Sequence, residues 1–189
     1  MQDIENEILH KIDELSSRKK FLLIGIDGRC ASGKTTLASL LQAYCDCSVI
    51  HMDHFFLRPE QRTEERLREP GGNVDYERFM AEVLFPLCSE EPFSYSPFDC
   101  KTQTLMAPVS VNPRPVNIIE GSYSCHPLLK DYYHLKIFLT TSPEEQMRRI
   151  LLRNGAERAP MFRDKWIPLE EQYFSFCHTE ENCDYIFTT

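Results

Sequence analysis

An eight-residue stretch, Gly28 to Thr35, follows the pattern Gly-x-x-x-x-Gly-Lys-Thr. An apolar run, residues 21–26, precedes it, and leucines at helical spacing follow it. Glycines in this pattern let the backbone curl until successive N–H groups face one anion, and the following helix adds its positive N-terminal end. The stretch predicts a strand, a phosphate-binding loop and a helix. A glycine-rich turn with an unrelated lysine is the less favoured interpretation.

Within this loop, Lys34 is expected to reach the outer phosphates of a nucleotide, and Thr35 to offer its hydroxyl to magnesium. The predicted phosphate-binding residues are Gly28, Arg29, Cys30, Ala31, Ser32, Gly33, Lys34, Thr35 and Thr36. Loop N–H groups and Lys34 would favour a thiolate at Cys30. The preferred interpretation of Cys30 is a small side chain that fits the loop.

Further apolar runs alternate with helical patterns, which is typical of an α/β protein built from right-handed βαβ units. The predicted strands cover residues 21–26, 48–52, 116–119, 135–139 and 184–187. Helices are predicted over residues 3–17, from the capping sequence Ser142-Pro143-Glu144-Glu145, and over 169–176, with a loop or short lid at about 153–166. At 189 residues the chain fits one domain, residues 1–189.

The formal net charge of −8 disfavours general binding to nucleic acids, which requires Lys and Arg against many phosphates. The sequence shows neither an export signal nor about 18 consecutive uncharged apolar residues, so we expect a cytoplasmic protein that does not bind membranes. The eight cysteines are then expected to be reduced. Cys45-x-Cys47 is too tightly spaced for a usual zinc site. A homo-oligomer stays open.

Two acidic residues follow predicted strands directly: Asp53 after residues 48–52 and Glu120 after residues 116–119. Ligands of open α/β sheets bind beyond the carboxyl ends of the strands, so both acids are expected near the loop. Either one is suited to hold magnesium, and one to accept the proton of an attacking hydroxyl. The alternative for each is a helix cap or an exposed turn acid.

Arginines gather in the segment that precedes and includes the predicted lid, at positions 148, 149, 153, 158 and 163. Phosphoryl transfer needs positive charge over the moving group, and Gly155 would allow closure over the site. A solvated helix face is the alternative for any single arginine. His51, His54 and His126 flank predicted strand ends and are expected to be hydrogen-bonded structural residues. The guanine-reading pattern Asn-Lys-x-Asp is absent, which argues against a switch GTPase.

With these features the chain resembles the uridine kinase family of P-loop kinases, which is similar to nicotinamide riboside kinase and phosphoribulokinase. The resemblance covers nearly the whole chain after residue 20 and rests on the loop, Met52-Asp53-His54-Phe55-Phe56, Asn73-Val74-Asp75-Tyr76-Glu77-Arg78-Phe79, Ile118-Ile119-Glu120-Gly121 and Arg148-Arg149-x-x-x-Arg153. It implies a P-loop fold with a five-stranded parallel sheet and a helical lid, and ATP and Mg²⁺ as cofactors.

The resemblance also implies roles for individual residues. Asp53 would be the base and Asp75 would hold ribose hydroxyls, while Thr35 and Glu120 would organise the metal. The predicted catalytic set is Asp53, Lys34, Glu120 and Arg153; Arg149 joins the nucleotide-binding residues; and Asp53, Asp75, Phe98 and Arg158 are predicted to bind the substrate.

Some positions depart from the family pattern. Phe98 stands where uridine kinases have tyrosine, and Gln103 falls about where they carry a base-reading histidine. A pocket without that hydroxyl and imidazole loses much of its discrimination for uracil. The lid lacks an Arg-Gly-Arg pattern, and residues 162–166 are similar to nicotinamide riboside kinases. Trp166 is expected either to stack on a ring or to fill a core or hinge position.

The function expected from the sequence is an ATP-dependent kinase that phosphorylates a small molecule on a hydroxyl, first of all the 5′-hydroxyl of a nucleoside. Nicotinamide riboside or another small hydroxylated metabolite is the alternative substrate. A regulatory protein that binds a nucleotide without transferring phosphate is the alternative from a different class. Asp53, Glu120 and the arginines disfavour it, because pure binding needs neither a base nor a charged lid.

Overall fold

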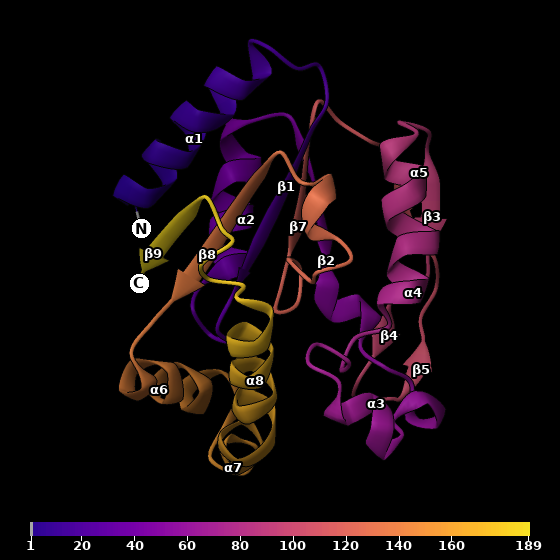
Figure 1. Ribbon diagram of the computed structural model, residues 1–189, viewed down its shortest axis with the longest axis vertical. Coiled ribbons are helices and arrows are strands. Elements are labelled where there is room, and N and C mark those ends of the chain that lie inside the picture. Colours follow the sequence, from indigo (N-terminus) through magenta and orange to yellow (C-terminus); the bar gives the residue numbers. More distant parts are fainter. Residues whose placement is uncertain (1) are drawn as a thin grey trace.

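The computed structural model describes residues 2–189 and is built around a five-stranded sheet (Figure 1). In spatial order the strands are β2 (Cys47–His51), β7 (Val116–Glu120), β1 (Leu22–Gly28), β8 (Leu135–Thr140) and β9 (Tyr185–Thr188). Every neighbouring pair is parallel. The predicted α/β class and five-stranded parallel sheet are therefore confirmed, and the strand bounds agree within two residues.

Strand β1 is buried along its whole length, as its apolar sequence predicts. Its alternate residues Leu22, Ile24 and Ile26 pack under the helices α1 (Gln2–Ser16) and α2 (Lys34–Tyr44). Leu23 belongs to the core on the other face of the sheet. The two-residue period of a strand places Asp27 on that second face as well, inside the protein.

The second face is covered by helices that come from distant parts of the chain (Figure 1). After β2 the chain forms the 3₁₀ turns η1 (Met52–Phe55) and η2 (Pro59–Gln61), then α3 (Glu64–Arg68), α4 (Tyr76–Phe79), the π-helical turn η3 (Met80–Leu84) and α5 (Phe85–Cys88). Two small antiparallel pairs follow, β3 (Phe93–Tyr95) with β6 (Val109–Val111) and β4 (Phe98–Asp99) with β5 (Thr104–Leu105). The short turn η4 (Lys130–Tyr132) precedes β8.

The C-terminal helices lie below the sheet in Figure 1, and side chains of the last of them join the core of this second face. Helix α6 (Pro143–Asn154) begins as predicted, because the Ser142 side chain accepts a hydrogen bond from the Glu145 N–H at 3.2 Å. The segment predicted as a loop or short lid at about 153–166 is mostly helical, as the helical lid of the resemblance implies. Helix α7 (Ala159–Met161), the π-helical segment η5 (Phe162–Trp166) and α8 (Ile167–Cys177) follow one another directly. Pro160 in the first turn of α7 does not interrupt the helix, since an N–H is dispensable there, and Pro168 lies just after the π-helical segment.

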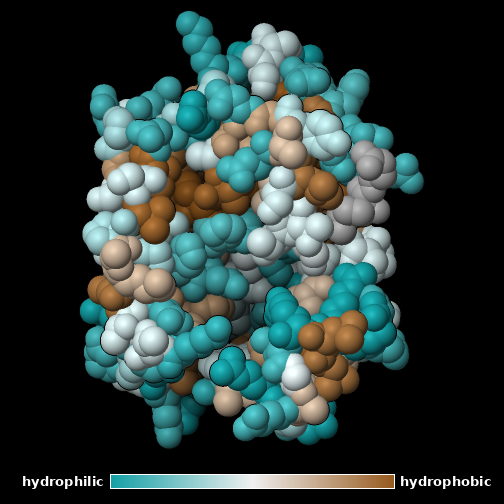
Figure 2. Space-filling model, turned by 180° about the vertical axis from the view of Figure 1, so that it is seen from behind, coloured by the Kyte–Doolittle hydropathy of each residue, from teal (hydrophilic) through white to brown (hydrophobic). Residues whose placement is uncertain are grey.

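The surface is mixed in character. Figure 2 shows mostly hydrophilic side chains, with apolar ones gathered in a hollow in the upper half of that face. Between residues 2 and 189, no helix is both long enough and apolar enough to cross a membrane.

Helix α1 owes its place to a few buried side chains. Ile8 is fully buried in the core under the sheet. Replacing it with alanine is expected to lower the free energy of unfolding by about 2–4 kcal/mol, because a cavity remains where the side chain packed. Urea denaturation measures this change. Leu152→Ala, at a position 75% exposed, is the control and should stay within about 0.5 kcal/mol of wild type; equal losses would contradict the packing role of α1.

Candidate active site

The predicted phosphate-binding loop connects β1 to α2. Gly28 has φ 132°, and a Cβ atom there would lie 2.0 Å from the carbonyl oxygen of Leu139 on β8. Gly33, which precedes the first helical residue, has φ 95°. Side chains are disfavoured at such angles, so both positions need glycine for the loop to close against the sheet. The predicted strand, loop and helix are all present.

Lys34 lies along the inner side of this loop. Its Nζ donates hydrogen bonds to the carbonyl oxygens of Gly28 at 2.6 Å and Arg29 at 2.9 Å. It also lies 3.4 Å from Ser122 Oγ, on the segment that follows β7. The ammonium group is therefore held where loop amides and the ends of β1 and β7 meet.

Glu120, the last residue of β7, meets Thr35 at the start of α2. Thr35 Oγ1 lies 3.2 Å from both carboxylate oxygens of Glu120. His51 pairs with Glu120 in the register of the sheet and places its Nδ1 2.5 Å from Oε1. This hydrogen bond raises the pKa of His51 against the opposing effect of burial. His51 therefore orients Glu120. The sequence predicted only a hydrogen-bonded structural histidine, without this partner.

Asp53 lies beside this pair, in the turn that follows β2. Its Oδ1 would be only 3.2 Å from a Cβ atom on Gly121, so the glycine after Glu120 leaves room for the Asp53 carboxylate. The residue is open to solvent, yet the protein atoms around its carboxylate raise its pKa. Lys34 opposes that effect, whereas Glu120 adds to it. The structure thus brings Asp53, Glu120, Lys34 and Thr35 together, as the sequence predicted.

This oxygen-rich set fits a magnesium ion that is shared with phosphate. Within residues 2–189, no group of three His, Cys, Asp or Glu side chains is arranged to hold a metal by itself. Mg²⁺ is usually bound by one or two protein oxygens together with substrate phosphates and water. The Thr35 hydroxyl and the Glu120 carboxylate are the protein oxygens here that could fill this role.

The predicted arginines are not equivalent. Arg149 packs against the outer side of the loop, where its Nη1 donates to the Ala31 carbonyl at 3.2 Å and its Nε to Glu145 at 2.7 Å. Arg153 is exposed and acts electrostatically on Asp53, whose carboxylate it favours in the charged form. Arg158 is exposed at the start of α7. The side chains of Arg148 and Arg163 pair with nearby acids on the surface.

The predicted substrate residues lie on the β2 side of the site. Asp75 is buried and caps α4: its Oδ1 accepts from the Arg78 N–H at 3.1 Å and its Oδ2 from Gln61 at 2.7 Å. Phe98 is buried beneath the Arg62 guanidinium, 5.9 Å from the ring centre. Gln103 bonds back to the Cys100 carbonyl within its own turn.

Two buried acids that contact the loop were not singled out from the sequence. Asp27, fully buried at the end of β1, accepts hydrogen bonds from the N–H groups of Gly28, Tyr123 and Cys125 and from the Tyr173 hydroxyl. Glu170 of α8 accepts from the Cys30 N–H at 2.9 Å. The alternation of β1 was the signal for Asp27, because it places a charge on an otherwise buried face. For Glu170 the helical spacing of the sequence gave no signal that the side chain is buried at the loop.

Cys30 behaves as the small side chain that was preferred for it. Burial, with a further contribution from Glu170, raises the pKa of its thiol to about 12, and Lys34 only partly opposes this. The thiolate is therefore disfavoured at neutral pH.

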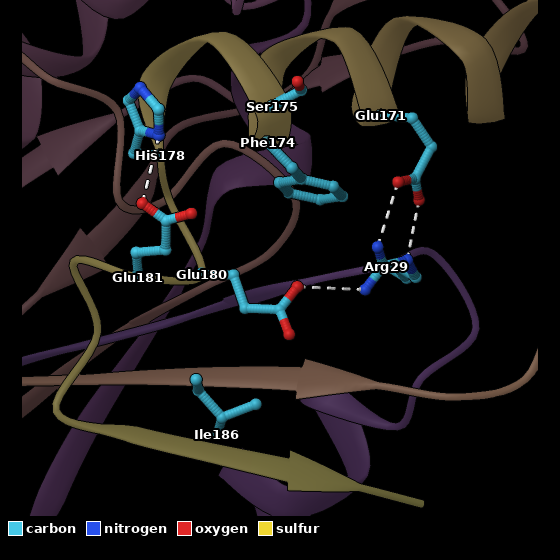
Figure 3. A pocket seen from close by; sticks show the side chains of 8 residues that line it. All are labelled: Arg29, Glu171, Phe174, Ser175, His178, Glu180, Glu181 and Ile186. Carbon is cyan, nitrogen blue, oxygen red and sulfur yellow. Dashed lines mark hydrogen bonds and ion pairs between the residues drawn. The ribbon is translucent and has the colours of Figure 1, made fainter.

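A separate hollow of about 470 Å³ lies behind the loop, between α8 and β9 (Figure 3). Arg29 reaches into it and forms two hydrogen bonds with Glu171, at 2.7 and 2.9 Å. The group that contains Lys34, Asp53 and Glu120 does not line this hollow. The arginine of the loop therefore ties α8 to the loop rather than facing Asp53.

Solved structures share this fold. A protein described as a possible uridine kinase from Bacillus stearothermophilus has a TM-score of 0.66 at 20% identity, over 96% of this chain and 99% of that one. A D-glycerate 3-kinase from Cryptococcus neoformans has a TM-score of 0.61 at 14% identity, over 90% of this chain and 87% of that one. At these identities the likeness establishes the fold: a P-loop kinase fold.

Curated relatives are similar in sequence. Nicotinamide riboside kinase 2 of Homo sapiens is 33% identical over 80% of this chain and 67% of its own length. Uridine kinase of Chloroflexus aggregans is 29% identical over 72% of this chain and 69% of its length. Uridine kinase-like protein 5 of Arabidopsis thaliana is 28% identical over 84% of this chain. The match covers only 35% of the length of the plant protein. No family model matches the chain.

The chain belongs to the uridine kinase-like family of P-loop kinases. The resemblance seen in the sequence is thereby confirmed, and so is the enzyme class, a phosphotransferase with an alcohol group as acceptor.

Asp27 gives a stability prediction. Asp27→Asn replaces one carboxylate oxygen with an NH₂ group, which then faces the N–H and O–H donors that bond to Asp27. We expect the free energy of unfolding to fall by about 1–3 kcal/mol. Urea denaturation measures it, with the exposed Asp13→Asn as the control. A loss no larger than that of the control would show that the buried carboxylate is not what holds these segments.

Proposed function

We propose that this protein uses ATP and Mg²⁺ to phosphorylate a hydroxyl group of a small molecule, with Asp53 as the base. The observation that supports this most is the convergence of Lys34, Thr35, Glu120 and Asp53 at one edge of the sheet. A protein that only binds nucleotides requires the loop but not an acid directed at an acceptor. The regulatory alternative has no comparable support.

The residues divide the work as follows. Lys34 and the loop amides bind the phosphates, while Thr35 and Glu120 would hold the metal, which would neutralise charge on the phosphates. Asp53 accepts the proton of the acceptor's hydroxyl while the hydroxyl oxygen forms a bond to the γ-phosphorus. The bond between that phosphorus and the bridging oxygen breaks, and ADP leaves with the bridging oxygen. The raised pKa of Asp53 strengthens it as a base. Arg153 and Arg149 are proposed to stabilise the charge that develops on the phosphates.

For the acceptor we propose a ribonucleoside, phosphorylated on its 5′-hydroxyl, with nicotinamide riboside or another hydroxylated metabolite as the alternative. Asp75 retains lone pairs for sugar hydroxyls beside its two hydrogen bonds, since a carboxylate accepts up to about four. Phe98 offers no hydroxyl, and Gln103 is engaged in its own turn. Sharp selection of uracil is therefore not expected.

The base assignment is tested by Asp53→Asn, which keeps the size of the side chain and removes the proton acceptor. We expect kcat to fall about 100-fold or more, with the Kd for ATP changed less than about threefold. Stopped-assay kinetics and calorimetry measure the two quantities. Asp46→Asn, an exposed acid paired with Arg114, is the control. Equal loss of turnover and binding would assign Asp53 to the metal instead, and unchanged turnover would exclude both roles.

The acceptor is tested by steady-state kinetics with uridine, cytidine, adenosine and nicotinamide riboside. We expect activity on at least one ribonucleoside with weak discrimination between uridine and cytidine, and Asp75→Ala should raise KM for that nucleoside more than for ATP. A sharp preference for uridine would contradict the inference from Phe98 and Gln103. Inactivity on all four would remove the nucleoside proposal and leave the kinase class standing.

A further inference from the structure

Three side chains of helix α8 form hydrogen bonds with the phosphate-binding loop and with the end of β1. The Tyr173 hydroxyl donates to Asp27 Oδ2 at 2.9 Å, and Glu171 pairs with Arg29 on the outer side of the loop (Figure 3). Glu170 accepts from the Cys30 N–H on the inner side. One helix therefore contacts the end of β1 at Asp27 and the loop at Arg29 and Cys30.

Glu170 differs from its neighbour in what surrounds it. It is only 6% exposed, and its Oε1 accepts from Ser122 Oγ at 2.8 Å. The same hydroxyl lies 3.4 Å from Lys34 Nζ. Burial raises the pKa of Glu170, whereas Lys34, the Cys30 amide and the Ser122 hydroxyl favour its charged form. The buried Glu170 is thus connected through the single hydroxyl of Ser122 to Lys34, the proposed phosphate-binding lysine.

Helix α8 is also the continuation of the lid. The π-helical segment η5 joins it to α7 without a break, and Trp166 stands at the junction. π-helical turns inside longer helices frequently lie at functional sites. A displacement of Glu170 therefore also moves the helix that continues from the lid.

Resting on the proposed function, we propose that Glu170 is a positioning residue that competes with the nucleotide phosphates for Lys34 and the loop, and so couples nucleotide binding to the lid. The phosphates bring negative charge next to the Glu170 carboxylate. The repulsion weakens nucleotide binding and displaces the start of α8. Because coupling is reciprocal, removing the charge strengthens nucleotide binding and weakens the response of the lid.

The test is Glu170→Gln, which keeps the shape of the side chain and removes its charge. Calorimetry with Mg²⁺ and AMP-PNP should show binding about three- to tenfold tighter than wild type, as expected for one like charge removed from a partly screened site. Trp166, the single tryptophan of the chain, reports on the lid, and its fluorescence change on saturation should be smaller than in wild type. A misfolded variant would bind more weakly, so tighter binding cannot arise from misfolding.

Glu171→Gln is the matched control, because it removes the same charge one residue along the same helix, from the outer side of the loop. We expect its Kd to stay within about twofold of wild type. Equal tightening in both variants, an unchanged Kd in Glu170→Gln, or a Trp166 signal of wild-type size would each overturn the proposal. If wild type itself does not bind Mg²⁺ and AMP-PNP, the proposed function fails; if wild type binds and Glu170→Gln is unaltered, only this inference fails.

Discussion

The Asp27 carboxylate is the interaction on which the site depends. It lies at the end of the central strand, fully buried, and receives hydrogen bonds from the loop, from the segment after β7 and from α8. A buried charge is tolerated only where donors compensate its lost hydration. Those donors come from three separate parts of the chain, so satisfying this acid also fixes the loop next to Glu120 and Lys34.

The parallel sheet explains why the remaining groups meet. Neighbouring strands β1, β7 and β2 end at the same edge, so the loop, Glu120 and the turn that carries Asp53 are brought together by register alone. Glycines at positions 28 and 121 then allow close approach, to β8 in one case and to Asp53 in the other. Strand pairing between distant segments and the backbone conformation of two glycines thus both bring the groups of the site together.

Much of this could be predicted from the sequence because the signals are local. The loop motif, the apolar strands and the Ser142 cap each lie within a few neighbouring residues, and acids after strands point to the shared edge. The resemblance implied a helical lid, but Gly155 and Pro160 taken by themselves also allowed a loop, because proline interrupts a helix except in its first turn. The contacts of Glu170 with Cys30 and of Asp75 with Gln61 join residues that are not neighbours in the sequence, so no short pattern specifies them.

The proposed function requires one edge of the sheet to hold ATP, a metal and a base in a single arrangement. A crystal structure with Mg²⁺, AMP-PNP and the acceptor found by kinetics tests it most directly. We predict a metal about 2.0–2.1 Å from Thr35 Oγ1, the γ-phosphate in contact with Lys34, and the acceptor hydroxyl within hydrogen-bond distance of Asp53. A nucleotide bound elsewhere, or an acceptor hydroxyl remote from Asp53, would contradict the account.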